Sequence, residues 1–269
     1  MNNNKVVDRS KGKQAKKYFL PKSLRLLFGG IVSLNVLWWL LAVVFNNKAL
    51  PNPMDVYATL PKTLSVGMLD HPLASLRRII IGVFLALVLG MAGGLLTGLS
   101  KKANKLLNPL LYLSYPVPKL ALLPVAMIIF GIGETTKVLM IVLIIVFQLI
   151  ISIRDSIGNI NKENYYVLST LGASKVQQIW HVVLPAILPE IFSALRISVG
   201  IATSVLFVTE TFGTDKGLGF FIVDAWMRID YLTMYAGIVM LSVIGSLLFM
   251  VIDIMDAMFC RWSKLRSRS

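Results

Sequence analysis

Long stretches without a single charged residue constrain this chain more than any other feature of its sequence. Three of them cover Leu26–Asn47, Ile79–Ser100 and Tyr231–Ile252, and a fourth, shorter one covers Val138–Ile153. A helix needs about 20 mostly apolar residues to cross a bilayer. Because lipid offers no water, the backbone must satisfy its own hydrogen bonds, which favours a helix for each run. The four runs therefore predict four membrane-spanning helices.

Two further apolar segments are interrupted by proline and by charge. The segment 106–133 contains four prolines and Lys119, and the segment 184–209 contains two prolines, Glu190 and Arg196. Proline is tolerated in a membrane helix where neighbouring groups satisfy the freed backbone. A charge within a span usually faces the bundle or a water-filled cavity. We therefore predict six spans in an all-α membrane domain over residues 26–258.

The composition agrees with this prediction and excludes several classes of protein. Apolar residues make up 56% of the 269 residues and charged residues 15%, whereas soluble domains carry about 25% charged residues. The net charge of +14 is better explained by the basic loops of a membrane protein than by nucleic acid binding. The single cysteine, Cys260, excludes an internal disulfide and a cysteine-based metal site.

Lysine and arginine are distributed unevenly between the predicted loops. With the N-terminus inside, the inner segments 1–25, 100–106, 154–181 and 259–269 contain 18 of these residues, and the outer segments contain seven. Cytoplasmic loops of membrane proteins are enriched in Lys and Arg. We therefore expect both termini in the cytoplasm, with 1–25 and 259–269 as basic tails.

Small residues recur along the second predicted span. Gly90, Gly94 and Gly98 are spaced four residues apart, so they share one face of the helix and let another helix approach closely. Packing within the chain explains this stripe better than a seam between two copies, which stays the alternative.

The loop before the fifth span, at about residues 156–182, has the pattern of two short helices. Asn164–Leu171 forms an amphipathic segment, and Gly172 permits a bend that other residues resist. Ser174 is a good N-cap for a second helix over Lys175–Val183. Leu184 and Pro185 then lead back into the membrane. A helix–glycine–helix on the cytoplasmic face suits the docking of another protein.

The run LGAS-(x)9-LP-(x)3-P in this loop resembles the cytoplasmic loop of binding-protein-dependent ABC importer permeases. Gly172 matches the glycine of that family's motif, and Leu184 and Pro185 match its Leu-Pro pair. Tyr166 stands where the family usually has glutamate. The segments 50–53, 71–87, 116–138 and 209–222 are similar to the permeases of nitrate, taurine and aliphatic sulfonate importers.

The resemblance implies a fold, partners and a membrane. It implies a type I ABC importer permease fold in a bacterial cytoplasmic membrane, paired as a dimer, here a homodimer, over two ATPase subunits that bind ATP-Mg. An extracytoplasmic binding protein would deliver the solute, a small anion such as nitrate, sulfonate or taurine. The residues expected to couple the permease to the ATPase are Tyr166, Leu171, Gly172, Ala173, Ser174, Leu184 and Pro185.

The sequence lacks the motifs that an enzyme would need. It contains no phosphate-binding G-x-x-x-x-G-K-[ST] motif, so ATP would have to be bound by a partner. It also contains no recognisable catalytic or metal-binding set, and we expect no catalytic residue, metal or cofactor on this chain. The alternative to an ABC permease is a secondary transporter driven by an ion gradient. Such transporters have discontinuous helices in internal repeats, and no repeat is visible here.

Three charges fall within or at the ends of the interrupted spans. Lys119, Arg196 and Glu210 should each face a partner or water, because an unpaired charge in the membrane is costly. One hypothesis is that they line the translocation path. The alternatives are a structural ion pair or a helix end at the membrane surface.

Overall fold

The computed structural model describes residues 19–65 and 69–262, and every regular element within these ranges is a helix. The chain forms two compact units, residues 1–59 and 60–269. The helical fold class is therefore confirmed for the described residues. Most of the predicted tails, residues 1–18 and 263–269, lie outside the described ranges.

The first unit contains helix α1, Phe19–Phe45, and the start of helix α2, Pro53–Ser65. Helix α1 covers most of the first predicted span, and its apolar side chains from Ile31 onward are largely exposed. Tyr57 on α2 donates its hydroxyl proton to Asn35 on α1, and its ring meets Trp38 edge to face at 6.2 Å.

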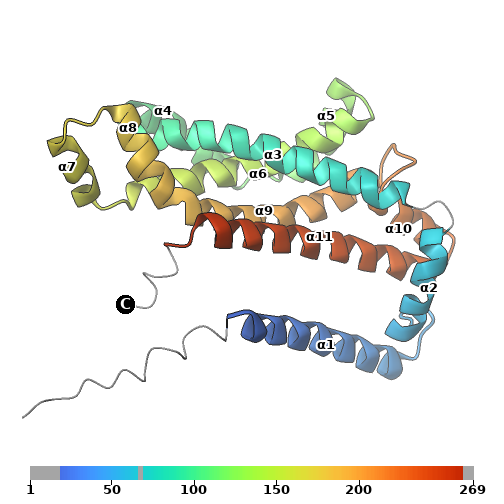
Figure 1. Ribbon diagram of the computed structural model, residues 1–269. Coiled ribbons are helices and arrows are strands. Elements are labelled where there is room, and N and C mark those ends of the chain that lie inside the picture. Colours follow the sequence, from blue (N-terminus) through green and yellow to red (C-terminus); the bar gives the residue numbers. More distant parts are fainter. Residues whose placement is uncertain (1–18, 66–68, 263–269) are drawn as a thin grey trace, which may run out of the picture. The chain divides into compact units, whose positions relative to one another are not determined.

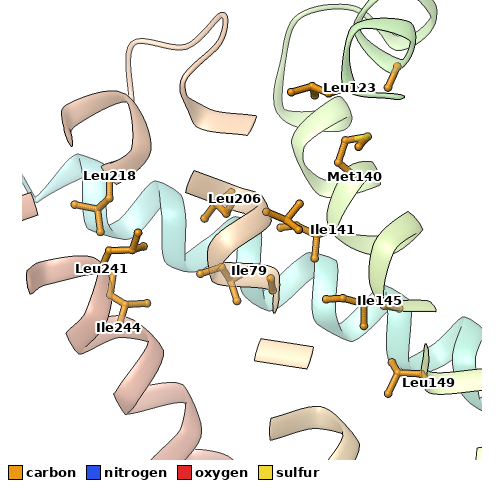
Figure 2. Close-up of a cluster of buried hydrophobic side chains, with 14 of the residues drawn as sticks. Ile79, Leu123, Met140, Ile141, Ile145, Leu149, Leu206, Leu218, Leu241 and Ile244 are labelled. Atoms are coloured by element: carbon orange, nitrogen blue, oxygen red, sulfur yellow. The ribbon is translucent and has the colours of Figure 1, made fainter. Parts of the chain in front are cut away.

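The second unit is built on four long apolar helices. They are α3 (Asp70–Leu99), α6 (Glu134–Gly158), α9 (Leu184–Glu210) and α11 (Tyr231–Phe259). Helix α10, Leu218–Met227, packs on α9 and α11. Each long helix satisfies the length and apolarity that a membrane span requires. Figure 2 shows buried side chains of these helices and of α10 meeting in one cluster, which includes Ile79, Met140, Ile141, Ile145, Leu149, Leu206, Leu218, Leu241 and Ile244.

The glycine stripe on α3 packs against α6 of the same chain. A Cβ atom at Gly90 would lie 2.6 Å from the Cβ of Leu149, and one at Gly94 would lie 2.6 Å from the Cβ of Ile153. At Gly98 the nearest atom, on Ile157, is also 2.6 Å away. Since real Cβ contacts are longer, only glycine permits this approach. The interpretation of the stripe as packing within the chain is confirmed.

The interrupted segment 106–133 is sharply bent. It contains helix α4 (Lys101–Ser114), the 3-10 turn η2 (Lys119–Leu122) and helix α5 (Leu123–Phe130), and the two halves differ in direction by 86°. The bend lies at Pro116 and Pro118, which lack N–H donors and disfavour a helical conformation in the preceding residue. Within the described residues there are four candidate spans, or five if the bent pair is one span.

The second interrupted segment proves to be part of one continuous helix. Helix α8 (Lys175–Gln178), the π-helical turn η3 (Ile179–Val183) and α9 run together over 36 residues. The prediction of a separate surface helix that ends at Val183 is therefore wrong. A π turn just before Pro185 provides one extra residue where the proline ring would otherwise crowd the preceding turn.

The two ends of the second unit carry different elements (Figure 1). Helix α7, Lys162–Thr170, and α8 lie at one end. Helix α10 and the loop that follows α9 lie at the other end.

Candidate functional site

The turn between α7 and α8 depends on glycine. Gly172 has a φ of +73°, in the left-handed region that costs other residues about 1–2 kcal/mol. A Cβ there would meet nothing within 4 Å, so the requirement is for conformation and not for space. The turn is closed by Ala173 N–H, which donates to the carbonyl of Leu168 at 3.0 Å. The bend predicted at Gly172 is confirmed.

Ser174 begins the helix that follows this turn. Its hydroxyl accepts a hydrogen bond from Gln177 N–H at 3.3 Å, and Gln177 Oε1 accepts one from Ser174 N–H at 2.8 Å. This reciprocal pair is a capping box, which satisfies two donors that the first turn leaves free. The predicted N-cap is confirmed, and it fixes the direction in which α8 leaves Gly172.

Apolar side chains project from this loop into open space. Tyr166 is 63% exposed and Leu171 is 77% exposed, whereas Ala173, Leu184 and Pro185 are half-buried. The prediction omitted Val176 and Trp180, which are also exposed. Their spacing of four residues, on one face of a helix, is the signal that could have found them. We call Tyr166, Leu171, Val176 and Trp180 the loop patch; exposed large apolar groups on one loop are typical of protein-docking surfaces.

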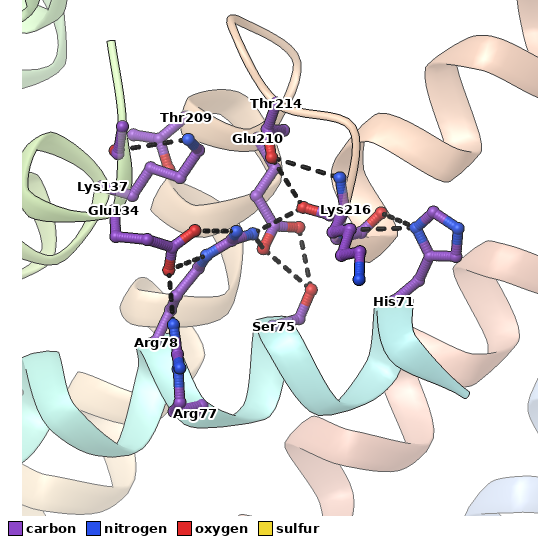
Figure 3. Close-up of polar contacts among 12 residues, drawn as sticks. His71, Ser75, Arg77, Arg78, Glu134, Lys137, Thr209, Glu210, Thr214 and Lys216 are labelled. Carbon is purple, nitrogen blue, oxygen red and sulfur yellow. Dashed lines mark hydrogen bonds and ion pairs between the residues drawn. The ribbon is translucent and has the colours of Figure 1, made fainter. Parts of the chain in front are cut away.

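A buried ion cluster lies at the opposite end of the bundle, and Glu210 is at its centre (Figure 3). Glu210 is completely buried. Its carboxylate accepts hydrogen bonds from Ser75 Oγ at 2.8 and 2.9 Å, from Arg78 Nη1 at 2.6 Å and from Gly219 N–H at 2.8 Å. Gly219 is in the first turn of α10, where free N–H groups favour an anion.

Arg78 connects Glu210 to a second carboxylate. Its Nη1 also donates to the carbonyl of Lys216 at 2.8 Å, and its Nε and Nη2 donate to the two oxygens of Glu134. Arg77 donates to Glu134 Oε2 at 3.1 Å. We call Ser75, Arg77, Arg78, Glu134 and Glu210 the Arg78 cluster. It joins α3, α6 and α9 to the start of α10.

The cluster was not predicted from the sequence, where Arg77 and Arg78 count only as loop charges and Glu210 has no assigned partner. The available signal was the position of Arg78 directly before an apolar run and of Glu134 four residues before another. The pairing itself was not visible, because Ser75 and Glu210 are 135 residues apart in the chain.

Contacts around the cluster hold the loop between α9 and α10. Lys216 forms an exposed ion pair with Asp70 at 2.8 Å, and that carboxylate raises the pKa of the Lys216 ammonium through a hydrogen bond and its charge. His71 Nδ1 accepts a hydrogen bond from Gly217 N–H at 3.1 Å. Gly217 has a φ of +135°, and a Cβ there would lie 2.4 Å from the Glu210 carboxyl carbon. The loop is therefore folded closely around the Glu210 side chain.

The other two predicted charges are held elsewhere. Lys119 Nζ donates to the carbonyl of Ser114 at 2.6 Å and lies 5.3 Å from the centre of the Phe147 ring. Arg196 Nε donates to Asp253 at 2.8 Å. Arg196 and Glu210 are 14 residues apart on one helix, or about 21 Å. The three charges thus do not form a single site, and Arg196 has the ion pair that was considered as the alternative.

Comparison with known proteins identifies relatives over most of the chain. A family model described as "Binding-protein-dependent transport system inner membrane component" matches residues 79–263. The taurine transport system permease protein TauC of Escherichia coli (strain K12) is 35% identical over 240 residues, which cover 85% of this chain and 86% of TauC. The nitrate import permease protein NrtB of Synechococcus elongatus is 29% identical over 201 residues, covering 71% of this chain and 72% of NrtB.

A solved structure shares the fold. The inward-facing MetNI methionine ABC transporter matches with a TM-score of 0.60 and 19% identity, over 69% of this chain and 93% of the matched chain. At that identity the match concerns the fold alone, and it agrees with the type I importer permease fold that the sequence predicts.

Proposed function

The chain belongs to the family of binding-protein-dependent transport system inner membrane components, and on that basis we propose that it forms the path for a small anion. Members of the family are membrane subunits of ABC importers, and ATP is hydrolysed by a partner ATPase. Neither relative compared above is described as an ion-gradient-driven transporter.

The loop between α7 and α8 is the surface that docks on the ATPase. The observation that carries this assignment is the positive φ of Gly172 followed by the capping box of Ser174. Together they fix a sharp turn that presents the loop patch to a partner. The residues assigned to coupling are Tyr166, Leu171, Gly172, Ala173, Ser174, Leu184 and Pro185, to which we add Val176 and Trp180.

Six spans and two cytoplasmic termini make up the proposed topology. The four long helices and the bent α4–α5 pair supply five spans, and α1 with its 27 residues supplies the sixth. The excess of Lys and Arg in the segments assigned to the inside supports this orientation. It puts the loop patch in the cytoplasm and the Arg78 cluster at the outer surface.

The complete importer contains two copies of this chain, two ATPase subunits with ATP-Mg, and an extracytoplasmic binding protein in a bacterial cytoplasmic membrane. One relative is named for taurine, which carries a sulfonate group, and one is named for nitrate, and both names support a small solute with an oxyanion group. Lys119, Arg196 and Glu210 are proposed to influence the path separately, since each is held by different partners.

Co-purification of the ATPase tests the proposed docking surface. Gly172→Val introduces a β-branched residue at a φ of +73°, and we expect at least a fivefold loss of bound ATPase, as a cost of about 1–2 kcal/mol implies. Gly158→Ala is the matched control, because Gly158 has no positive φ and open space around its Cβ position. Undiminished ATPase binding by Gly172→Val would contradict the assignment.

A further inference from the structure

The guanidinium of Arg78 has two edges with different surroundings. Its Nη1 is held on the buried side by Glu210 and by the carbonyl of Lys216. Its Nε and Nη2 face the carboxylate of Glu134 as a two-pronged donor, the geometry that fits carboxylate and other planar oxyanion edges. The side chain of Arg78 is only 3% exposed, whereas that of Glu134 is 47% exposed. Arg78 is therefore fixed independently of Glu134.

Arg77 completes the set of donors around this carboxylate. It donates a third N–H to Glu134, and its own side chain is 65% exposed. A cavity of 300 Å³ opens beside the three residues and is lined also by Leu73, Ala74 and Asp215. The Glu134 carboxylate thus accepts hydrogen bonds from three N–H groups, which converge on it at the wall of an open cavity.

The charged groups around this position are balanced when the position holds one negative charge. Glu210 compensates Arg78, and Asp70 compensates Lys216. Lys137 and Asp215 add one further positive and one further negative charge to this group. Without Glu134, the charge of Arg77 alone would be left uncompensated. The site therefore suits one monovalent anion.

The side chain of Glu134 is half-exposed and follows a short connection that contains two glycines. Gly131 has a φ of +81°, and a Cβ at Gly131 or at Gly133 would meet nothing within 4 Å. Glu134 itself begins α6. A rotation of the half-exposed Glu134 side chain would remove the carboxylate, while Arg78 would keep its bonds to Glu210 and to the carbonyl of Lys216.

We propose that Arg77 and Arg78 form a binding site for a monovalent oxyanion, which Glu134 occupies in this structure as a tethered carboxylate. The transported solute takes this site when Glu134 leaves it. Three oxygens of a sulfonate, or the oxygens of nitrate, accept the same three N–H groups. This inference rests on the proposed function, because it assumes that the solute is an anion.

Binding of ethanesulfonate to the purified permease–ATPase complex tests the site. The titration is done by calorimetry in a Tris chloride buffer, so that the buffer supplies no competing carboxylate or sulfonate. A tethered carboxylate competes at an effective concentration in the millimolar range or above. We therefore expect Glu134→Gln to bind ethanesulfonate at least tenfold more tightly than the unmodified complex, and Arg77→Gln/Glu134→Gln to lose that gain.

Two further variants make the result specific. Asp224→Asn removes a negative charge from the ion pair with Arg228 on α10 and should bind as the unmodified complex does. Glu134→Asp keeps the charge but shortens its reach, and should bind ethanesulfonate with intermediate affinity even if Glu134→Gln fails to accumulate.

Two outcomes would overturn the site. One is an affinity of Glu134→Gln and Glu134→Asp no higher than that of the unmodified complex. The other is chloride binding as tight as ethanesulfonate binding, because a single atom cannot engage three separate donors. Co-purified ATPase is measured on the same samples, so its absence would count against the proposed function and not against the anion site.

Discussion

Replacing Glu210 by glutamine should lower the stability of the protein markedly. The amide has nearly the shape of the carboxylate, but one of its two oxygens becomes an NH2 group. In the native protein both carboxylate oxygens accept hydrogen bonds, from Ser75, Arg78 and Gly219. In either orientation of the amide, its NH2 group faces an N–H donor, that of Arg78 or that of Gly219. Arg78 also loses its fully buried counter-charge.

The size of the effect follows from what Arg78 retains. Removing one partner of a buried ion pair costs about 3–5 kcal/mol. Because Arg78 keeps Glu134, the lower end of this range, about 3 kcal/mol, applies. At about 2–4 °C per kcal/mol for a domain of this size, the melting midpoint should fall by about 6–12 °C.

Cys260 provides the assay. It is the chain's only cysteine, and it is buried, so a thiol-reactive dye reports unfolding of the detergent-solubilised protein during heating. Asp224→Asn serves as the control, because it disrupts an exposed ion pair that is worth at most about 1 kcal/mol. A midpoint for Glu210→Gln within about 2 °C of the unmodified protein would refute the account of the Arg78 cluster.

Three other substitutions test the packing and the two surfaces. Gly94→Val should destabilise the protein by about 1–3 kcal/mol, because its Cβ would overlap Ile153. Gly29→Ala is the control and should not destabilise the protein, because the space around Gly29 is open. Equal melting midpoints for the two variants would contradict the close α3–α6 contact. Trp180→Ala should reduce ATPase co-purification while leaving the midpoint unchanged, since Trp180 is exposed; unchanged co-purification would remove it from the docking surface. Asp70→Asn should shift the midpoint by no more than about 2 °C, and a larger loss would show that its exposed pair with Lys216 supports the loop.

The long helices were predictable because apolar runs are a local property of the sequence. The start of α11 at Tyr231 agrees with the prediction, whereas those of α3 and α6 lie earlier than predicted, since the criterion of an uncharged run stops at the first charge. Helix α3 begins at Asp70 and not at Ile79, and α6 begins at Glu134 and not at Val138. The charges in these first turns are paired or hydrogen-bonded in the fold, so they do not end the helix.

The turn at Gly172 was predictable, whereas the ion cluster was not. A glycine bend and a serine N-cap act within a few residues, so composition and spacing reveal them. The bond between Arg78 and Glu210 joins residues 132 positions apart, and no periodicity in one sequence indicates such a pairing. The direction of the bend at Pro116 and Pro118 also depends on neighbouring helices, which explains why the segment was taken as one interrupted span.

The continuous helix over residues 175–210 has a mechanical consequence. It begins beside the loop patch and ends at Glu210, so one backbone spans the distance between the two candidate sites. Helix α9 alone has 27 residues, which correspond to about 40 Å, and a tilt of about 5° about its inner end moves Glu210 by about 3.5 Å. That displacement exceeds the length of any hydrogen bond in the Arg78 cluster. A modest rotation imposed on α8 is therefore enough to separate donors from acceptors at the far end, with no intermediate element to relay it.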